Sequence, residues 1–283
     1  MAAKRLPDVQ QARIGRFQFG PWHLTVGESH ILQSDGKDRE RFQSELKLPD
    51  TPEMVFAENV LRLKHKDGFG IEFNALDALK LVDPHQDFFK VAATKAWVAA
   101  REDCEHIKDV IKPFDWTFST DYKGTLLSEG DMKLEVSETT EQLDLEKLKR
   151  HDKMHFYADI PLFEDELADH GTAILSVKMR VMPTLFLILL RFHMRVDDVV
   201  VRVRDTRLYH EMGKNYILRE YTAKEQSLQN SAIPLNILTD VNQIAQRLPV
   251  VEHKLEKLSF PEGVAADEAD FTMKETTEKT EES

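Results

Sequence analysis

The sequence has one cysteine, no long apolar run and a deficit of basic side chains. With Cys104 alone, the chain cannot form an internal disulfide, which fits a reducing compartment. The longest apolar run, LFLILL at residues 185–190, is far shorter than the roughly 20 residues that a membrane-spanning helix needs. The formal net charge of −12 makes nucleic acid and anionic membranes poor partners for the surface as a whole.

The common catalytic motifs are also missing. The sequence contains no G-x-S-x-G, no P-loop and no H-E-x-x-H. Cys104 and His106 stand two residues apart, so on a helix they point to different sides, which favours a structural cysteine over a thiol–base pair. The residues alone therefore favour a binding protein over an enzyme.

The sequence predicts one folded domain between a flexible N-terminal segment and a disordered C-terminal tail. No linker-like stretch divides the interior of the 283-residue chain, which predicts a single domain over residues 15–260. We expect residues 1–14 to be flexible. The acidic tail, residues 261–283, carries only Val264, Phe271 and Met273 as sizeable apolar groups, so we expect it to be disordered.

Strand patterns dominate the interior. Apolar and polar residues alternate over 59–76 around Lys66-Asp67-Gly68, which predicts a hairpin. Residues 175–183, 184–196, 199–211 and 215–225 predict four strands joined by short turns, an antiparallel meander. Helices are predicted over 88–111, 141–156 and 227–248, the last interrupted at Pro234. The predicted fold class is α+β, with an antiparallel sheet core of meander and hairpins and with peripheral helices.

The segment FEDELADHG, residues 163–171, has two interpretations. On a helix, Glu166 and His170 would share one face, and such a pair can bind a metal. The alternative function is then a metal-dependent hydrolase that uses Glu164, Asp165, Glu166, Asp169 and His170. The structural interpretation is a short acidic helix that ends at Gly171 in a left-handed cap. A third possibility for the chain is a scaffold whose acidic tail recruits a basic partner.

Six blocks in order resemble the TIPRL family, the TOR signalling pathway regulator-like proteins. They are FGPW, GFGIEFNALDAL, IKPFDWTFSTDYKGTL, FEDELADHG, SVKMRVMP and RDTRLYHE, and they span nearly the whole predicted domain. The resemblance implies a non-enzymatic regulator without metal or cofactor. It implies binding to the catalytic subunits of type 2A, 4 and 6 protein phosphatases, including their C-terminal tail, restraint of their activity, and a role in TOR and DNA-damage signalling. We expect a monomer when free, in the cytoplasm and also in the nucleus.

The resemblance also implies four partner-binding residues: Asp77, Leu143, Val203 and Asp205. Each has a structural interpretation as well. Asp77 could cap a helix, Asp205 could pair with Arg207, and the two apolar residues could belong to the core. Phe114 and Phe118 stand where relatives usually carry tyrosine, so no hydroxyl at these positions is essential in this chain.

Overall fold

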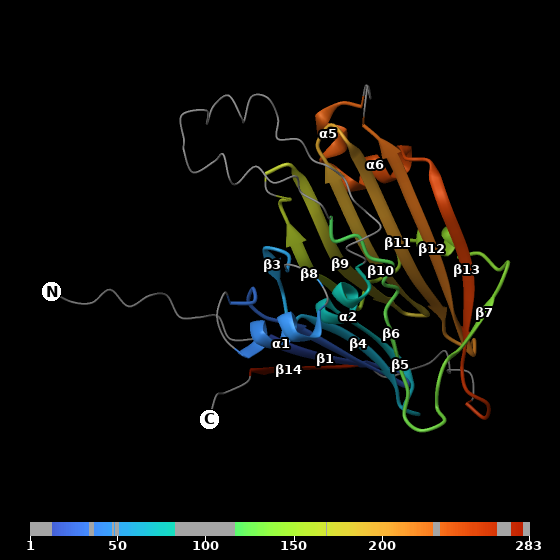
Figure 1. Cartoon of the computed structure of the whole chain (residues 1–283). Helices are drawn as coiled ribbons and strands as arrows, with labels where there is room; N and C mark the ends of the chain where they lie inside the picture. Colours follow the sequence, from blue (N-terminus) through green and yellow to red (C-terminus); the bar gives the residue numbers. More distant parts are fainter. Residues whose placement is uncertain are drawn as a thin grey trace, which may run out of the picture.

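Antiparallel strands make up most of the computed structural model, which describes residues 13–33, 37–46, 48, 51–82, 117–167, 169–228, 233–264 and 273–279. The strands form two sheets that pack against each other (Figure 1). The six-stranded sheet has the order β14 (Met273–Lys279), β1 (Arg13–Phe19), β2 (Trp22–Glu28), β4 (Val60–His65), β5 (Gly70–Asn74) and β6 (Thr125–Leu127). The α+β class is confirmed.

The eight-stranded sheet contains the predicted meander. Its order is β3 (Met54–Val55), β8 (Phe156–Asp165), β9 (Gly171–Met182), β10 (Leu185–Val196), β11 (Val200–Glu211), β12 (Tyr216–Ser227), β13 (Val250–Ser259) and β7 (Glu135–Glu138). Strands β9 to β12 follow one another through short turns, as the alternation predicts. The turn before β11 places Asp198 at φ 60°, a left-handed conformation that aspartate tolerates better than most residues.

A hydrophobic core fills the space between the two sheets. The side chains of β10 alternate, and Phe186, Ile188, Leu190, Phe192 and Met194 point to the six-stranded sheet. Trp22 on β2 meets Phe186 and His210 edge-on, with ring centroids 5.6 and 5.7 Å apart. We call this side of the eight-stranded sheet its inner face and the opposite side its outer face.

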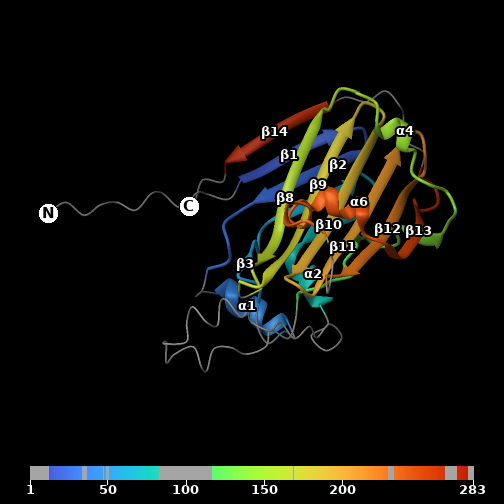
Figure 2. The same cartoon turned by 90° about the horizontal axis from the view of Figure 1, so that it is seen from above.

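The helices of the described residues are short. They are α1 (Lys37–Glu45), α2 (Ala75–Lys80), α4 (Leu145–Leu148), α5 (Leu235–Leu238) and α6 (Val241–Arg247). Figure 2 shows α6 and α4 on the outer face of the eight-stranded sheet.

Two helix predictions need correction, and the third, 88–111, lies outside the described residues. The helix predicted over 141–156 is wrong for most of its length, because only Leu145–Leu148 is helical and Phe156 begins β8. The helix predicted over 227–248 divides into α5, which begins after Pro234, and α6, which begins after its cap Asp240. Pro234, which lacks the backbone N–H that a helix interior needs, precedes α5, while the division between α5 and α6 lies at Asp240, whose side chain caps α6.

The segment FEDELADHG is a strand end and a turn, so the predicted acidic helix is wrong. Strand β8 ends at Asp165 and β9 begins at Gly171. The Asp165 carboxylate accepts hydrogen bonds from the backbone N–H groups of Leu167 at 2.6 Å and Glu53 at 2.9 Å. A Cβ at Gly171 would lie 1.9 Å from the carbonyl oxygen of Arg195, so only glycine fits there.

Both chain ends contain strand residues within segments that were expected to be flexible or disordered. The segment 273–279 lies in the tail that was expected to be disordered, yet it pairs with β1 from Phe19↔Met273 to Arg13↔Lys279. β1 also begins at Arg13, inside the segment 1–14 that was expected to be flexible. Pairing with a sheet edge satisfies backbone hydrogen bonds without apolar burial, so composition alone does not exclude it. The remaining domain limits stay a prediction.

Candidate functional site

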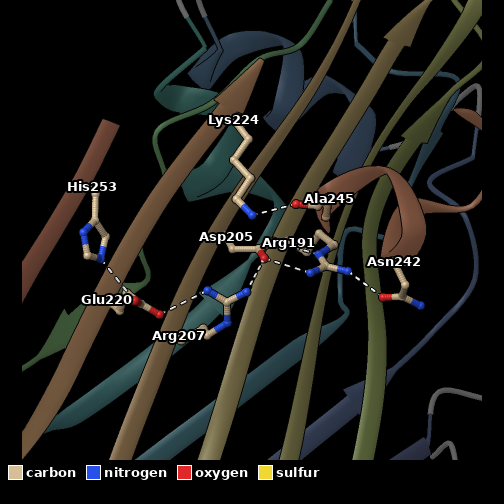
Figure 3. Close-up of polar contacts among 8 residues, drawn as sticks. All are labelled: Arg191, Asp205, Arg207, Glu220, Lys224, Asn242, Ala245 and His253. Atoms are coloured by element: carbon tan, nitrogen blue, oxygen red, sulfur yellow. Dashed lines mark hydrogen bonds and ion pairs between the residues drawn. The ribbon is translucent and has the colours of Figure 1, made fainter. Parts of the chain in front are cut away.

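The outer face of the eight-stranded sheet carries a row of charged side chains across its central strands. Because side chains alternate along β11, Leu208 and His210 point inward while Val203, Asp205 and Arg207 point outward. The register places Arg191 of β10 opposite Asp205, and Thr222 of β12 on its other side. The outer polar strip, as we call it, consists of Arg191, Asp205, Arg207, Glu220 and His253 (Figure 3).

Asp205 is the centre of this strip. Arg191 donates to it from Nε at 2.7 Å and from Nη2 at 2.8 Å, and Arg207 donates from Nη2 at 2.7 Å. Its side chain is 3% exposed, so these bonds form in a low-dielectric environment. Asp205 is thus the shared acceptor of two arginines, one on β10 and one on β11.

The strip becomes more exposed toward β13. Arg207 Nη1 donates to Glu220 at 3.1 Å, and His253 Nε2 lies 3.1 Å from the other oxygen of Glu220. The exposed fraction of the side chain rises from 3% at Asp205 to 29% at Arg207 and 43% at His253. A ligand in solution therefore reaches the Arg207–Glu220–His253 end and not Asp205 itself.

Helix α6 is attached to the other end of the strip. Arg191 Nη1 donates to Asn242 Oδ1 at 2.8 Å, and Lys224 Nζ donates to the carbonyl oxygen of Ala245 at 2.6 Å (Figure 3). Beneath the helix, Val203 packs in an apolar cluster with Ile244. Because the same guanidinium binds Asp205 and α6, the aspartate orients the arginine that holds the helix.

A second apolar cluster borders the strip on the side of α4. It contains Leu143, Met182, Leu185, Tyr209 and Leu218. Glu141 fixes the chain that carries Leu143, since it accepts hydrogen bonds from Tyr216 at 2.7 Å and Lys214 at 3.0 Å and pairs with Lys257 at 3.1 Å. Burial alone would raise the pKa of Glu141, but these contacts outweigh it and lower the pKa to about 2.

His193 is a buried titratable group on the same face. It lies opposite Val203 on β11 and Ile174 on β9, and it is 7% exposed. Within the described residues its Nε2 has no hydrogen-bond partner. Burial, followed by repulsion from Arg195 and Arg191, lowers the pKa of His193 to about 4, so the ring is neutral at physiological pH.

The structure brings three of the four predicted site residues to this face. Leu143, Val203 and Asp205 all lie on the outer side, each less than a tenth exposed. Their structural interpretations therefore hold as well: the apolar pair is in the core and Asp205 does pair with Arg207. Their contact with a partner stays a prediction.

Asp77 does not join them. It is the third residue of α2, where its N–H donates to the N-cap Asn74 at 2.8 Å and its carboxylate accepts from Thr125 Oγ1 at 2.6 Å. Helix α2 follows β5 of the six-stranded sheet, on the inner side of the eight-stranded sheet. Asp77 and Asp205 therefore do not line one cleft, because strand β11 turns Asp205 to the opposite face.

Sequence reasoning missed most of the strip. Arg191, Glu220, Asn242 and His253 were not among the predicted site residues. The signal for Arg191 was present, since a turn at Asp197-Asp198 sets a register in which Arg191 falls opposite Asp205. Asn242 and His253 come from segments that carry no strand or motif signal, and only the tertiary fold brings them to the strip.

The described part of the chain has neither the side-chain grouping of a metal site nor a membrane-spanning helix. No group of three or more histidine, cysteine, aspartate or glutamate side chains there could hold a metal ion. In FEDELADHG, both oxygens of Asp165 bind backbone N–H groups. None of the described helices has the length and apolar character to cross a membrane.

Comparison with known proteins identifies close similarities over most of the chain. The model of the TIP41-like family matches residues 54–231. A TIP41-like protein of Homo sapiens is 51% identical over 255 residues, covering 90% of this chain and 93% of that protein. A TIP41-like protein of Caenorhabditis elegans is 42% identical over 258 residues, covering 86% and 90%. The Type 2A phosphatase activator TIP41 of Saccharomyces cerevisiae is 38% identical over 264 residues, covering 84% and 73%.

Proposed function

The chain belongs to the TIP41-like family, and from this premise we propose that it is a non-enzymatic regulator of type 2A protein phosphatases. The single observation that carries the proposal is its 38% identity to a yeast protein named as a type 2A phosphatase activator. We further propose that it binds the catalytic subunits of types 2A, 4 and 6 and restrains their activity. The yeast name states activation for that protein, so the sign of the effect on activity is a separate outcome of the test.

The outer polar strip supports a peptide-binding role. A C-terminal tail ends in a carboxylate, and arginine binds carboxylates through paired N–H groups. Arg207 already donates one N–H to each of two carboxylates, Nη2 to Asp205 and Nη1 to Glu220, and it is the most accessible arginine of the strip. We propose that the tail contacts the Arg207–Glu220–His253 end, while Asp205, Leu143 and Val203 shape that surface from beneath.

Binding measurements with purified catalytic subunits test the proposal directly. Wild-type protein is titrated into the subunits of types 2A, 4 and 6, with and without their tails, by calorimetry. Arg207→Ala should weaken binding at least about tenfold, as expected when a charge-assisted interface contact is lost. The matched control is Arg180→Ala, an exposed arginine on β9 outside the strip, which should bind as wild type. Equal affinities of Arg207→Ala and wild type would exclude the strip as the contact.

An activity assay with the same purified proteins shows whether the chain lowers or raises phosphatase activity. Phosphatase activity toward a phosphopeptide is measured with increasing amounts of the chain. If the chain restrains the phosphatase, phosphatase activity should fall and reach a constant level at one equivalent of the chain. A rise in activity would make the chain an activator, as the yeast relative is named.

Size-exclusion chromatography with light scattering checks the monomeric state of the free chain. The roles in TOR and DNA-damage signalling and the cytoplasmic and nuclear location are proposals for cell-based tests with the Arg207→Ala variant.

A further inference from the structure

Residues 117–124, which we call the strap, connect the two sheets on the inner side. Figure 1 shows the green chain that leads into β6 beside α2. On the side of α2, Thr120 Oγ1 donates to the carbonyl oxygen of Ala78 at 2.8 Å, and Tyr122 Oη donates to the carbonyl oxygen of Glu72 at 2.9 Å. On the other side, the strap contacts β11. It therefore bridges elements that are far apart in the sequence.

Two arginines of β11 donate hydrogen bonds to the strap. Arg202 Nη1 donates to Ser119 Oγ at 2.7 Å, and Arg204 Nη1 donates to Asp121 Oδ1 at 2.8 Å. These arginines alternate along β11 with Val203 and Asp205, whose side chains lie on the outer face. The strap thus fixes from the inner side the part of the strand that carries the outer polar strip.

The backbone of the strap is strained. Phe118 has φ 54° and is 2% exposed. A bulky residue is sterically disfavoured in the left-handed region and persists there only where surrounding contacts enforce it. The hydrogen bonds on both sides of the strap supply this enforcement, so losing one anchor should let the strap relax.

Asp77 provides the anchor at the base of the strap. Its Oδ2 accepts from Thr125 Oγ1 at 2.6 Å and from Asn74 Nδ2 at 3.0 Å. Thr125 Oγ1 lies 3.0 Å from Oη of Tyr122, which is itself a strap residue. All of these contacts are internal to the chain. A partner on the outer face cannot touch Asp77, because the eight-stranded sheet lies between them.

We infer that Asp77 is a positioning residue. Its carboxylate holds Thr125 and, through the strap, the Ser119 and Asp121 anchors of β11, and this sets the geometry of the outer polar strip on the opposite side of the sheet. The predicted effect of Asp77 on partner binding rests on the proposed function, whereas its predicted effect on the strap does not. It assigns Asp77 an indirect role, where the family resemblance implies a direct contact.

Substitutions that separate the charge of Asp77 from its hydrogen bond to Thr125 test the inference. Asparagine keeps an oxygen that can accept from Thr125, but it removes the charge. Asp77→Asn should therefore bind the type 2A catalytic subunit within about threefold of wild type, whereas Asp77→Ala should bind about tenfold more weakly. Thr125→Val removes the donor at constant shape and should match Asp77→Ala. The double variant Asp77→Ala with Thr125→Val should be no weaker than either single variant, since both remove the same bond.

Hydrogen exchange of the free chain supplies the second readout. Asp77→Ala should lower the protection of amides in the strap and in β11 around Val203, and Asp77→Asn should restore it. If the wild-type chain binds none of the catalytic subunits, the proposed function fails and the exchange data still decide this inference. Unchanged exchange in Asp77→Ala overturns it. So does a direct-contact pattern, in which Asp77→Asn loses binding and Thr125→Val binds as wild type.

Discussion

Arg191 and Asp205 form a two-pronged ion pair on neighbouring strands, with Nε to Oδ1 at 2.7 Å and Nη2 to Oδ2 at 2.8 Å. The pair sits on the outer face of the eight-stranded sheet, and Arg207 completes the set of donors to the same carboxylate. Arg191 also donates from Nη1 to Oδ1 of Asn242 on α6. One ion pair therefore joins the central meander to the helix that covers Val203.

The first prediction concerns the loss of this pair. Asp205→Asn leaves the largely buried Arg191 guanidinium without its counter-charge, which should lower the free energy of unfolding by about 3 kcal/mol. For a chain of this size, Tm should fall by roughly 6 to 12 °C in calorimetry. Asp121→Asn is the matched control, because Asp121 pairs with Arg204 but its side chain is mostly exposed, and its loss should cost at most about 1 kcal/mol.

A double variant separates stability from binding at Asp205. Arg191→Leu with Asp205→Leu removes both charges, so most of the lost stability should return. Phosphatase binding should stay weak, because α6 and Arg207 have lost their orienting partners. Binding that recovers together with Tm would show that Asp205 matters only for folding.

The meander was predictable from the sequence, whereas the edges of the sheets were not. Apolar and polar residues alternate along β9 and the second half of β10, and each turn of the meander contains Gly, Pro or Asp, so the strands and their register can be read. The first half of β11 reverses the usual pattern, since Arg202 and Arg204 point inward and Val203 points outward. β13 contains charged residues on both sides (VVEHKLEKLS), because part of its edge and both of its faces meet solvent. That pattern resembles a solvated helix, and local periodicity cannot identify such a strand.

The site could be predicted only in part, for a related reason. Asp205 and Arg191 belong to strands whose register the turns determine, so their pairing is local information. His253 and Asn242 reach the strip from β13 and α6, whose docking depends on contacts distant in sequence. The role of Asp77 likewise depends on Thr125, 48 residues further on, and no periodicity links the two.

The second prediction concerns the C-terminal strand. Truncation after Val264 removes β14, so the β1 amides that bond to it should lose protection from hydrogen exchange. Tm should fall by only a few degrees, because Met273 is the only large apolar residue in the strand. Removal of residues 280–283 alone is the control and should leave β1 protected. A collapse of the whole six-stranded sheet would show that β14 is integral to it.

The third prediction is a pH dependence from His193. Its pKa is lowered to about 4 in the folded chain and is 6.5 when unperturbed, so below neutral pH the unfolded chain binds a proton that the folded chain rejects. The free energy of unfolding should therefore fall by about 2 kcal/mol between pH 7 and pH 5 from this residue. Urea titrations should show that His193→Leu removes this part of the pH dependence, while the exposed His151→Gln does not. Equal slopes for His193→Leu and wild type would contradict the assignment.

The last prediction concerns Glu141, which holds the chain carrying Leu143 against the outer face. Its pKa is lowered to about 2 from 4.5, so the stability that its contacts provide is present above pH 4.5 and is lost as pH falls toward 2. Glu141→Gln keeps the shape but weakens the bonds to Lys214 and Lys257, so amides of residues 139–148 should exchange faster at pH 7 and this acid-dependent loss should disappear. Glu146→Gln on the same segment is the control, because Glu146 is exposed and contacts only Lys149 among the described residues.

If Leu143 shapes the partner surface, Glu141→Gln should also weaken phosphatase binding, while Glu146→Gln should not. Faster exchange with unchanged binding would remove Leu143 from the site and leave it as a core residue.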